Sequence, residues 1–120
     1  MTDAPLPRCP HRPPCGGCAL LGLPLEEQRA WKRGRAADAL ARFPSLRGVE
    51  VRDCVPAPSA TGYRTRVKFA VARASGRRAA LGLFRPGSHE VLDLPGCLVV
   101  HAGLRPILEE LRELLGGTPL

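Results

Sequence analysis

The chain of 120 residues lacks any long apolar run, and this absence sets the first limits on its function. The run from Ala19 to Leu25 is interrupted by Gly22 and Pro24 and is far too short to span a bilayer. The opening residues, MTDAPLPRCP, also lack the basic segment followed by an apolar segment that marks a secretory signal. We therefore expect a cytoplasmic protein with no membrane partner.

Lysine is scarce, at Lys32 and Lys68 alone, whereas arginine is abundant and the formal net charge is +7. Nucleic acid is the commonest acidic partner of a small basic domain. The accompanying excess of Ala, Gly and Pro is also what the codon bias of a GC-rich genome produces. Charge alone therefore gives only weak support for a nucleic-acid partner.

Cysteine is present in a pattern that indicates a metal site. Three of the five cysteines, Cys9, Cys15 and Cys18, lie in CPHRPPCGGC, and Cys97 follows far downstream in LDLPGC. Thiolates so close together on a loop rich in Pro and Gly can converge on one centre, which a distant fourth can close. In a reducing cytosol, clustered cysteines favour metal binding over disulfides. Spacing alone leaves both zinc and an iron-sulfur cluster open, while Cys54 fits a small apolar residue in a strand-like run.

Apolar periodicity predicts an α+β fold with a small antiparallel sheet and flanking helices. The cysteine pattern adds a Cys-rich N-terminal loop that a metal cluster would tie to the sheet. Helices are expected at 24–43 and 104–115, and strands at 49–55, 63–73, 79–85 and 89–94. We expect a Cys-rich loop that could bind a metal cluster at 1–23, a helical segment at 24–44 and a central α+β domain at 45–120, which carries the basic residues considered below for RNA binding. The apolar stripe of the 24–44 segment is narrow, so this helix is expected to need a further partner surface.

The segment from Tyr63 to Arg73 has the clearest alternation and carries the basic residues of interest. In an extended strand, alternate cations form a ladder that suits the phosphates of an extended RNA strand, and the turn at Ser75 and Gly76 extends it. An ordinary solvated sheet face has the same pattern. The candidate RNA-binding residues are Tyr63, Arg64, Arg66, Lys68, Arg77, Arg78 and His89.

Three stretches together resemble one enzyme family. CPHRPPCGGCALLGLPLEEQRAWK, GYRTRVKFAV and LGLFRPGSHEVLDLPGC resemble, in order and spacing, the N-terminal and central part of the S-adenosylmethionine-dependent RNA (uracil-5-)-methyltransferases, 23S rRNA type. The resemblance implies a 4Fe-4S cluster, with zinc as the alternative, held by Cys9, Cys15, Cys18 and Cys97. It also implies RNA as the partner, ribosomal RNA ahead of transfer RNA.

The chain departs from the family where catalysis is concerned. The family reaction uses a cysteine nucleophile at uracil C6, methyl transfer to C5 and a base, all in a C-terminal Rossmann-like domain. No Gly-rich turn joins a hydrophobic strand to a helix here, and no cysteine follows Cys97. We therefore assign no catalytic residue and expect the S-adenosylmethionine site in a missing or separate methyltransferase domain, against which the 24–44 helix packs. The alternative is a free-standing zinc or iron-sulfur adaptor that binds nucleic acid.

Overall fold

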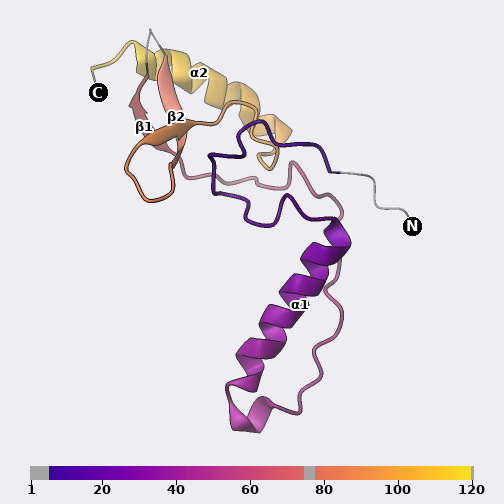
Figure 1. Ribbon diagram of the computed structural model, residues 1–120. Helices are drawn as coiled ribbons and strands as arrows, with labels where there is room; N and C mark the ends of the chain where they lie inside the picture. The colour runs from indigo at the N-terminus through magenta and orange to yellow at the C-terminus, as the bar shows by residue number, and fades with distance from the viewer. Residues whose placement is uncertain (1–5, 75–77, 120) are drawn as a thin grey trace. The chain divides into compact units, whose positions relative to one another are not determined.

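The computed structural model describes residues 6–74 and 78–119 (Figure 1). These residues form two compact units. The helical unit comprises residues 6–8 and 20–58, and the sheet unit comprises residues 9–19, 59–74 and 78–119. The Cys-rich segment thus belongs to the same unit as the sheet. Within the described residues, no helix combines the length and apolar character needed to cross a membrane.

The helical unit is built on α1 (Leu25–Ala41), followed by a short 3-10 turn at Pro44–Leu46. Pro24 precedes the helix and Glu26 and Glu27 lie in its first turn, where acidic side chains favour a helix N-terminus. The helix expected at 24–43 is therefore confirmed. None of its residues, all described, is buried.

The strand expected at 49–55 is wrong, because the described residues 49–57 contain no strand. A strand needs a neighbouring strand, and this segment meets α1 instead. Arg33 of α1 donates from Nε to the Val51 carbonyl at 2.8 Å and from Nη1 to Asp53 at 2.9 Å.

The sheet unit contains three antiparallel strands in the order β1 (Ala70–Arg73), β2 (Ala79–Phe84) and β3 (Val91–Asp93). The α+β class and the small antiparallel sheet are confirmed. Gly82 lies on β2 beside the backbone of β3, since a Cβ built there would be 1.8 Å from the Leu92 carbonyl oxygen. Only glycine fits this position without displacement of the backbone.

The strand expected at 63–73 is too long, because only residues 70–73 form β1. Ahead of them, the chain pairs with a different segment. The Arg64 N–H donates to the Val99 carbonyl at 2.8 Å, and the His101 N–H donates to the Arg64 carbonyl at 2.8 Å, which gives an isolated parallel bridge between Arg64 and Val100. Arg64, Arg66 and Lys68 therefore do not form a ladder along one strand. Ser75, Gly76 and Arg77 lie outside the described residues.

The core is small and lies between the sheet, the 94–100 segment and α2 (Arg105–Gly116). Among the residues that the structure describes, six apolar side chains are buried in it: Ala79, Ala80, Leu81, Leu94, Val99 and Val100. The final helix is present as expected and packs on β2. Its residues Ile107 and Leu114, however, are 53% and 62% exposed, whereas Arg112 is 1% exposed. The apolar spacing thus predicted the helix correctly, but its most buried side chain is charged.

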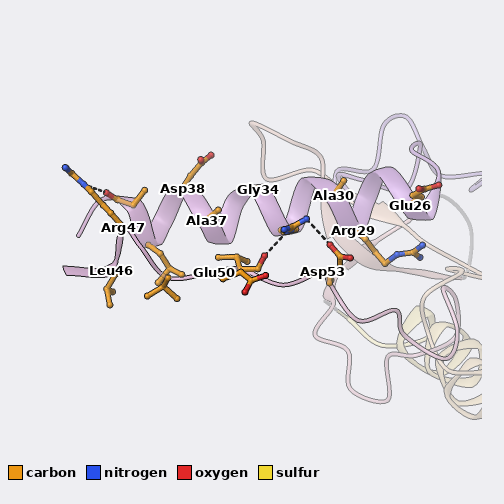
Figure 2. Close-up of a pocket in the computed structure, with 16 residues that line it drawn as sticks. Glu26, Arg29, Ala30, Gly34, Ala37, Asp38, Leu46, Arg47, Glu50 and Asp53 are labelled. Carbon is orange, nitrogen blue, oxygen red and sulfur yellow. Dashed lines mark hydrogen bonds and ion pairs between the residues drawn. The ribbon is translucent and has the colours of Figure 1, made fainter. Parts of the chain in front are cut away.

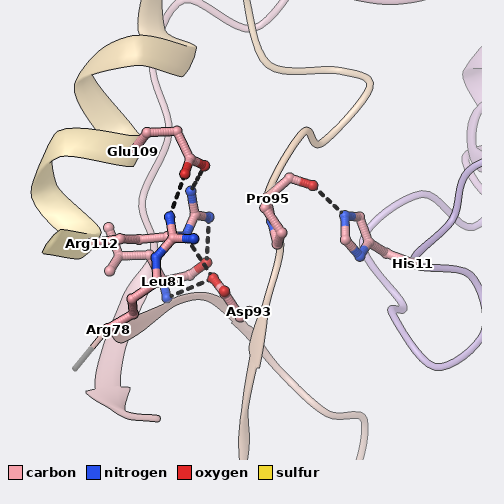
Figure 3. A network of polar contacts seen from close by, with 7 residues as sticks. All are labelled: His11, Arg78, Leu81, Asp93, Pro95, Glu109 and Arg112. Atoms are coloured by element: carbon pink, nitrogen blue, oxygen red, sulfur yellow. Dashed lines mark hydrogen bonds and ion pairs between the residues drawn. The ribbon is translucent and has the colours of Figure 1, made fainter. Parts of the chain in front are cut away.

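Arg112 joins α2 to two strands through a polar network (Figure 3). Its guanidinium donates to Asp93 at 2.8 Å, to the Leu81 carbonyl at 3.3 Å and to Glu109 on its own helix. Asp93 also accepts from the Leu81 N–H at 3.1 Å. This network satisfies a buried cation and fixes the end of β3 against β2.

Candidate metal centre and nucleic-acid interface

The Cys-rich loop lies directly against the end of β2, and its two glycines make this approach possible. A Cβ at Gly17 would be 2.8 Å from Leu83 Cδ1, and one at Gly16 would be 3.0 Å from Pro86 Cγ. Both distances are shorter than ordinary carbon contacts. Within the loop, the Cys15 N–H donates to the His11 carbonyl at 2.8 Å. The GG pair between Cys15 and Cys18 is therefore explained by packing on the hairpin of β2 and β3.

His11 connects the loop to the segment that carries Cys97 (Figure 3). Its Nε2 lies 2.6 Å from the carbonyl oxygen of Pro95, two residues before Cys97. Between them, Gly96 adopts a φ of +64°, a left-handed conformation that glycine tolerates without strain. The Cys97 carbonyl then accepts from the Val100 N–H at 3.2 Å. The loop and the segment after β3 are thus joined by the hydrogen bond from the His11 side chain to the Pro95 carbonyl.

The four candidate ligands lie in the sheet unit, whereas Cys54 lies in the helical unit. All four are half-buried. Burial raises the pKa of the Cys18 thiol, and the charges of Cys97, Cys15 and Cys9 raise it further, while the Arg64 guanidinium opposes them. Because such effects weaken with distance, Cys18 has the other three thiols in its electrostatic neighbourhood.

The donor set fits a thiolate-bound metal centre in its chemistry. Four cysteines can supply all four ligands of a zinc ion or of a 4Fe-4S cluster. Among residues 6–74 and 78–119, no group of three or more His, Cys, Asp or Glu side chains is already arranged to hold a metal ion. The assignment of Cys9, Cys15, Cys18 and Cys97 as ligands stays a prediction.

The candidate RNA-binding residues are dispersed rather than aligned on one strand. Tyr63 is 54% exposed, and Arg64, Arg66 and Lys68 are exposed. Arg64 acts electrostatically on Cys18, which places it near the cysteines. The remaining members differ in their surroundings: Arg78 forms an ion pair with Glu109, His89 meets the ring of Phe84 edge-on at 5.6 Å, and Arg77 lies outside the described residues.

Several contacts have no clear signal in the sequence. Arg112 follows Leu108 by one helical turn, so its position on the buried side was visible, but its charge suggested exposure. His11 lies in a loop without periodicity, and its partner Pro95 lies 84 residues away. Because these contacts depend on the path of the backbone, local patterns did not reveal them.

The helical unit has a groove of its own, of about 800 Å³, between α1 and residues 46–54 (Figure 2). Its lining carries both signs of charge, including Arg33, Arg47, Glu50 and Asp53, and it also includes Cys54. Arg33 spans the groove through its contacts with Val51 and Asp53. No candidate ligand or RNA-binding residue is among the residues that line it.

Comparison with known proteins found relatives among RNA methyltransferases. An uncharacterized RNA methyltransferase of Nitratidesulfovibrio vulgaris is 37% identical over 91 residues, which cover 76% of this chain and 19% of the relative. The 23S rRNA (uracil(1939)-C(5))-methyltransferase RlmD of Halomonas elongata is 37% identical over 109 residues, or 89% of this chain and 22% of the relative. An uncharacterized RNA methyltransferase of Thermosynechococcus vestitus is 32% identical over 114 residues, which cover 95% of this chain and 25% of the relative.

The chain spans about a fifth to a quarter of the length of these relatives. No family model matches it. The resemblance noted from the three sequence motifs is nevertheless confirmed by the relatives.

Proposed function

We propose that this chain is the cluster-bearing, RNA-recognition portion of an RNA (uracil-C5) methyltransferase, because the relatives that it matches at 37% identity are RNA methyltransferases. In this proposal the substrate is ribosomal RNA, and the chain is not catalytic by itself. Methyl transfer from S-adenosylmethionine belongs to a further domain or partner.

The observation that supports the proposal is that Cys9, Cys15, Cys18 and Cys97 all belong to the sheet unit. The loop with Cys9, Cys15 and Cys18 packs on β2, and His11 bonds to the segment that leads to Cys97. We propose that these four thiolates hold a 4Fe-4S cluster. Four cysteine ligands leave no open position for a substrate, so the cluster would cross-link the loop to the end of β3 rather than bind a substrate.

Metal content tests the cluster. After anaerobic purification we expect a brown protein with broad absorption near 400 nm and about four irons per chain. Cys97→Ser should abolish the iron, whereas Cys54→Ser, in the other unit, should retain it. A colourless protein with one zinc ion per chain would replace the cluster by zinc, and a chain without metal would remove the proposal.

The RNA-recognition role is supported by exposed cations in the sheet unit. Arg66 and Lys68 are exposed, and no contact that the structure gives within its described ranges pairs either of them with an acidic side chain. Arg85, in contrast, is paired with Glu90 at 2.9 Å. A cation that is free to meet a phosphate releases a counterion on binding, whereas one already paired contributes less.

Salt dependence of RNA binding tests this role. We expect the cluster-loaded chain to bind a ribosomal RNA fragment with an affinity that falls as salt rises. Arg66→Ala should reduce the slope of log K against log salt by about 0.7–0.9, the value for one phosphate contact. Arg85→Ala removes the same charge and should change the slope less. Equal effects of the two variants would argue against a specific contact by Arg66.

A further inference from the structure

The hydrogen bond from His11 to Pro95 joins two segments that are 84 residues apart in the chain. Its donor is settled by the acceptor, because a carbonyl oxygen only accepts, so Nε2 carries the proton. At 2.6 Å the contact is short for an N–H···O bond. His11 is half-buried and Pro95 is exposed, so water can reach this bond.

The acceptor is held in a defined direction. The ring of Pro95 restricts its own φ, and Gly96 at a φ of +64° turns the chain immediately afterwards. The next residue is Cys97. The hydrogen bond to the Pro95 carbonyl therefore holds the backbone just before the turn that leads to the Cys97 thiol.

The other close approaches of the loop serve a different purpose. Gly16 and Gly17 bring the loop against Pro86 and Leu83, which belong to β2 and the turn after it. These contacts locate the loop on the hairpin but do not involve the segment of Cys97. In the described part of the chain, the bond from His11 is the side-chain hydrogen bond that links residues 9–19 with residues 95–97.

We propose that His11 is a positioning residue, which holds the Cys97 segment against the Cys-rich loop and so pre-organises the thiol pair Cys18 and Cys97 before any metal binds. The biological role of this positioning, in preparing the thiols for a cluster, rests on the proposed function. The pre-organisation itself is a property of the metal-free chain. It is measured without iron, zinc or RNA.

Thiol-disulfide equilibrium measures how closely two thiols are held. In a background with Cys9, Cys15 and Cys54 replaced by serine, the metal-free chain is equilibrated with glutathione buffers under anaerobic conditions. The fraction of the Cys18–Cys97 disulfide, read by mass spectrometry, yields the effective concentration of one thiol at the other. Circular dichroism of each variant verifies that it is folded.

We expect His11→Ala to lower this effective concentration about three- to tenfold, the range for loss of one hydrogen bond. His11→Gln should restore it to within about twofold, because the Gln Nε2 amide can donate in nearly the same place. Arg12→Ala is the matched control, since its guanidinium donates to the Ala19 carbonyl within the loop and should leave the equilibrium unchanged.

Three results would overturn the proposal: an unchanged equilibrium in His11→Ala, a Gln variant that behaves as Ala, or no disulfide in the parent background. A Co²⁺ titration of the chain with all its cysteines gives a second measure. His11→Ala should weaken the thiolate-bound cobalt spectrum at a given concentration, and His11→Gln should not. Failure of iron incorporation would sink the proposed function, while the disulfide equilibrium would still decide the role of His11.

Discussion

In the Arg112 network, replacement of Asp93 should lower the free energy of unfolding more than replacement of Arg112 itself. Asp93→Ala leaves the guanidinium of Arg112, 1% exposed, with one carboxylate and one carbonyl. It also withdraws the acceptor of the Leu81 N–H. Breaking a buried ion pair in this way costs about 3–5 kcal/mol, and since Glu109 remains, we expect about 3 kcal/mol of unfolding free energy to be lost.

Arg112→Met removes the buried charge itself. The side chains of Asp93 and Glu109 are 38% and 46% exposed, so both carboxylates can be hydrated once the guanidinium is gone. Methionine also fills much of the space that the arginine stem occupied. We therefore expect a loss of about 1 kcal/mol, so the two variants differ by about 2 kcal/mol.

Urea denaturation of the reduced, metal-free chain, followed by circular dichroism, measures the difference. With an m value of about 2 kcal/mol/M, a loss of 3 kcal/mol moves the midpoint by about 1.5 M. Amide exchange at Leu81 reports the same loss locally. Glu90→Ala, which removes an acid from the exposed pair with Arg85, should cost less than about 1 kcal/mol. The reasoning is refuted if Arg112→Met costs as much as Asp93→Ala.

Two further predictions concern two glycines and the Cys18 thiol. Gly82→Ala should destabilise the sheet unit by more than about 2 kcal/mol, because the added Cβ would meet the backbone of β3. Gly34→Ala lies in α1 with open space around it and should stabilise the helix by about 0.5–1 kcal/mol, so urea denaturation should show opposite changes in the two variants. The raised pKa of Cys18 leaves less thiolate, so iodoacetamide at pH 8 should alkylate it more slowly in the folded metal-free chain than in urea, and Arg64→Gln should slow it further. A folded-state rate as fast as that in urea would contradict the shift. Since the folded pKa is the higher one, this thiol's contribution to stability falls as pH rises through the thiol range.

The elements that were predicted well depend on local patterns. The helices at Leu25–Ala41 and Arg105–Gly116 and the strand at Ala79–Phe84 lie close to the expected ranges. Helical and strand periodicities are properties of neighbouring residues, and Pro24 and the Gly116–Gly117 pair mark helix ends locally. These features needed no knowledge of the rest of the fold.

The elements that were predicted badly depend on partners. Residues 49–55, which alternate like a strand, contact α1 instead of another strand. Residues 63–73 do not form one strand, because Arg64 pairs with the 99–101 segment. A period of two predicts an extended chain, but only a second strand turns it into a sheet. The predicted ladder of Arg64, Arg66 and Lys68 along one strand is wrong for the same reason.

The sequence by itself determined where the helices and the central strand form, because periodicity is a local property, and from residue type it predicts which four thiols could hold a metal. Only the tertiary structure decided which distant groups meet. It brought His11 to Pro95, Arg64 to the neighbourhood of Cys18, and Arg112 into the core with Asp93. Such contacts follow from the path of the backbone between remote segments, and no short stretch of sequence contains that path.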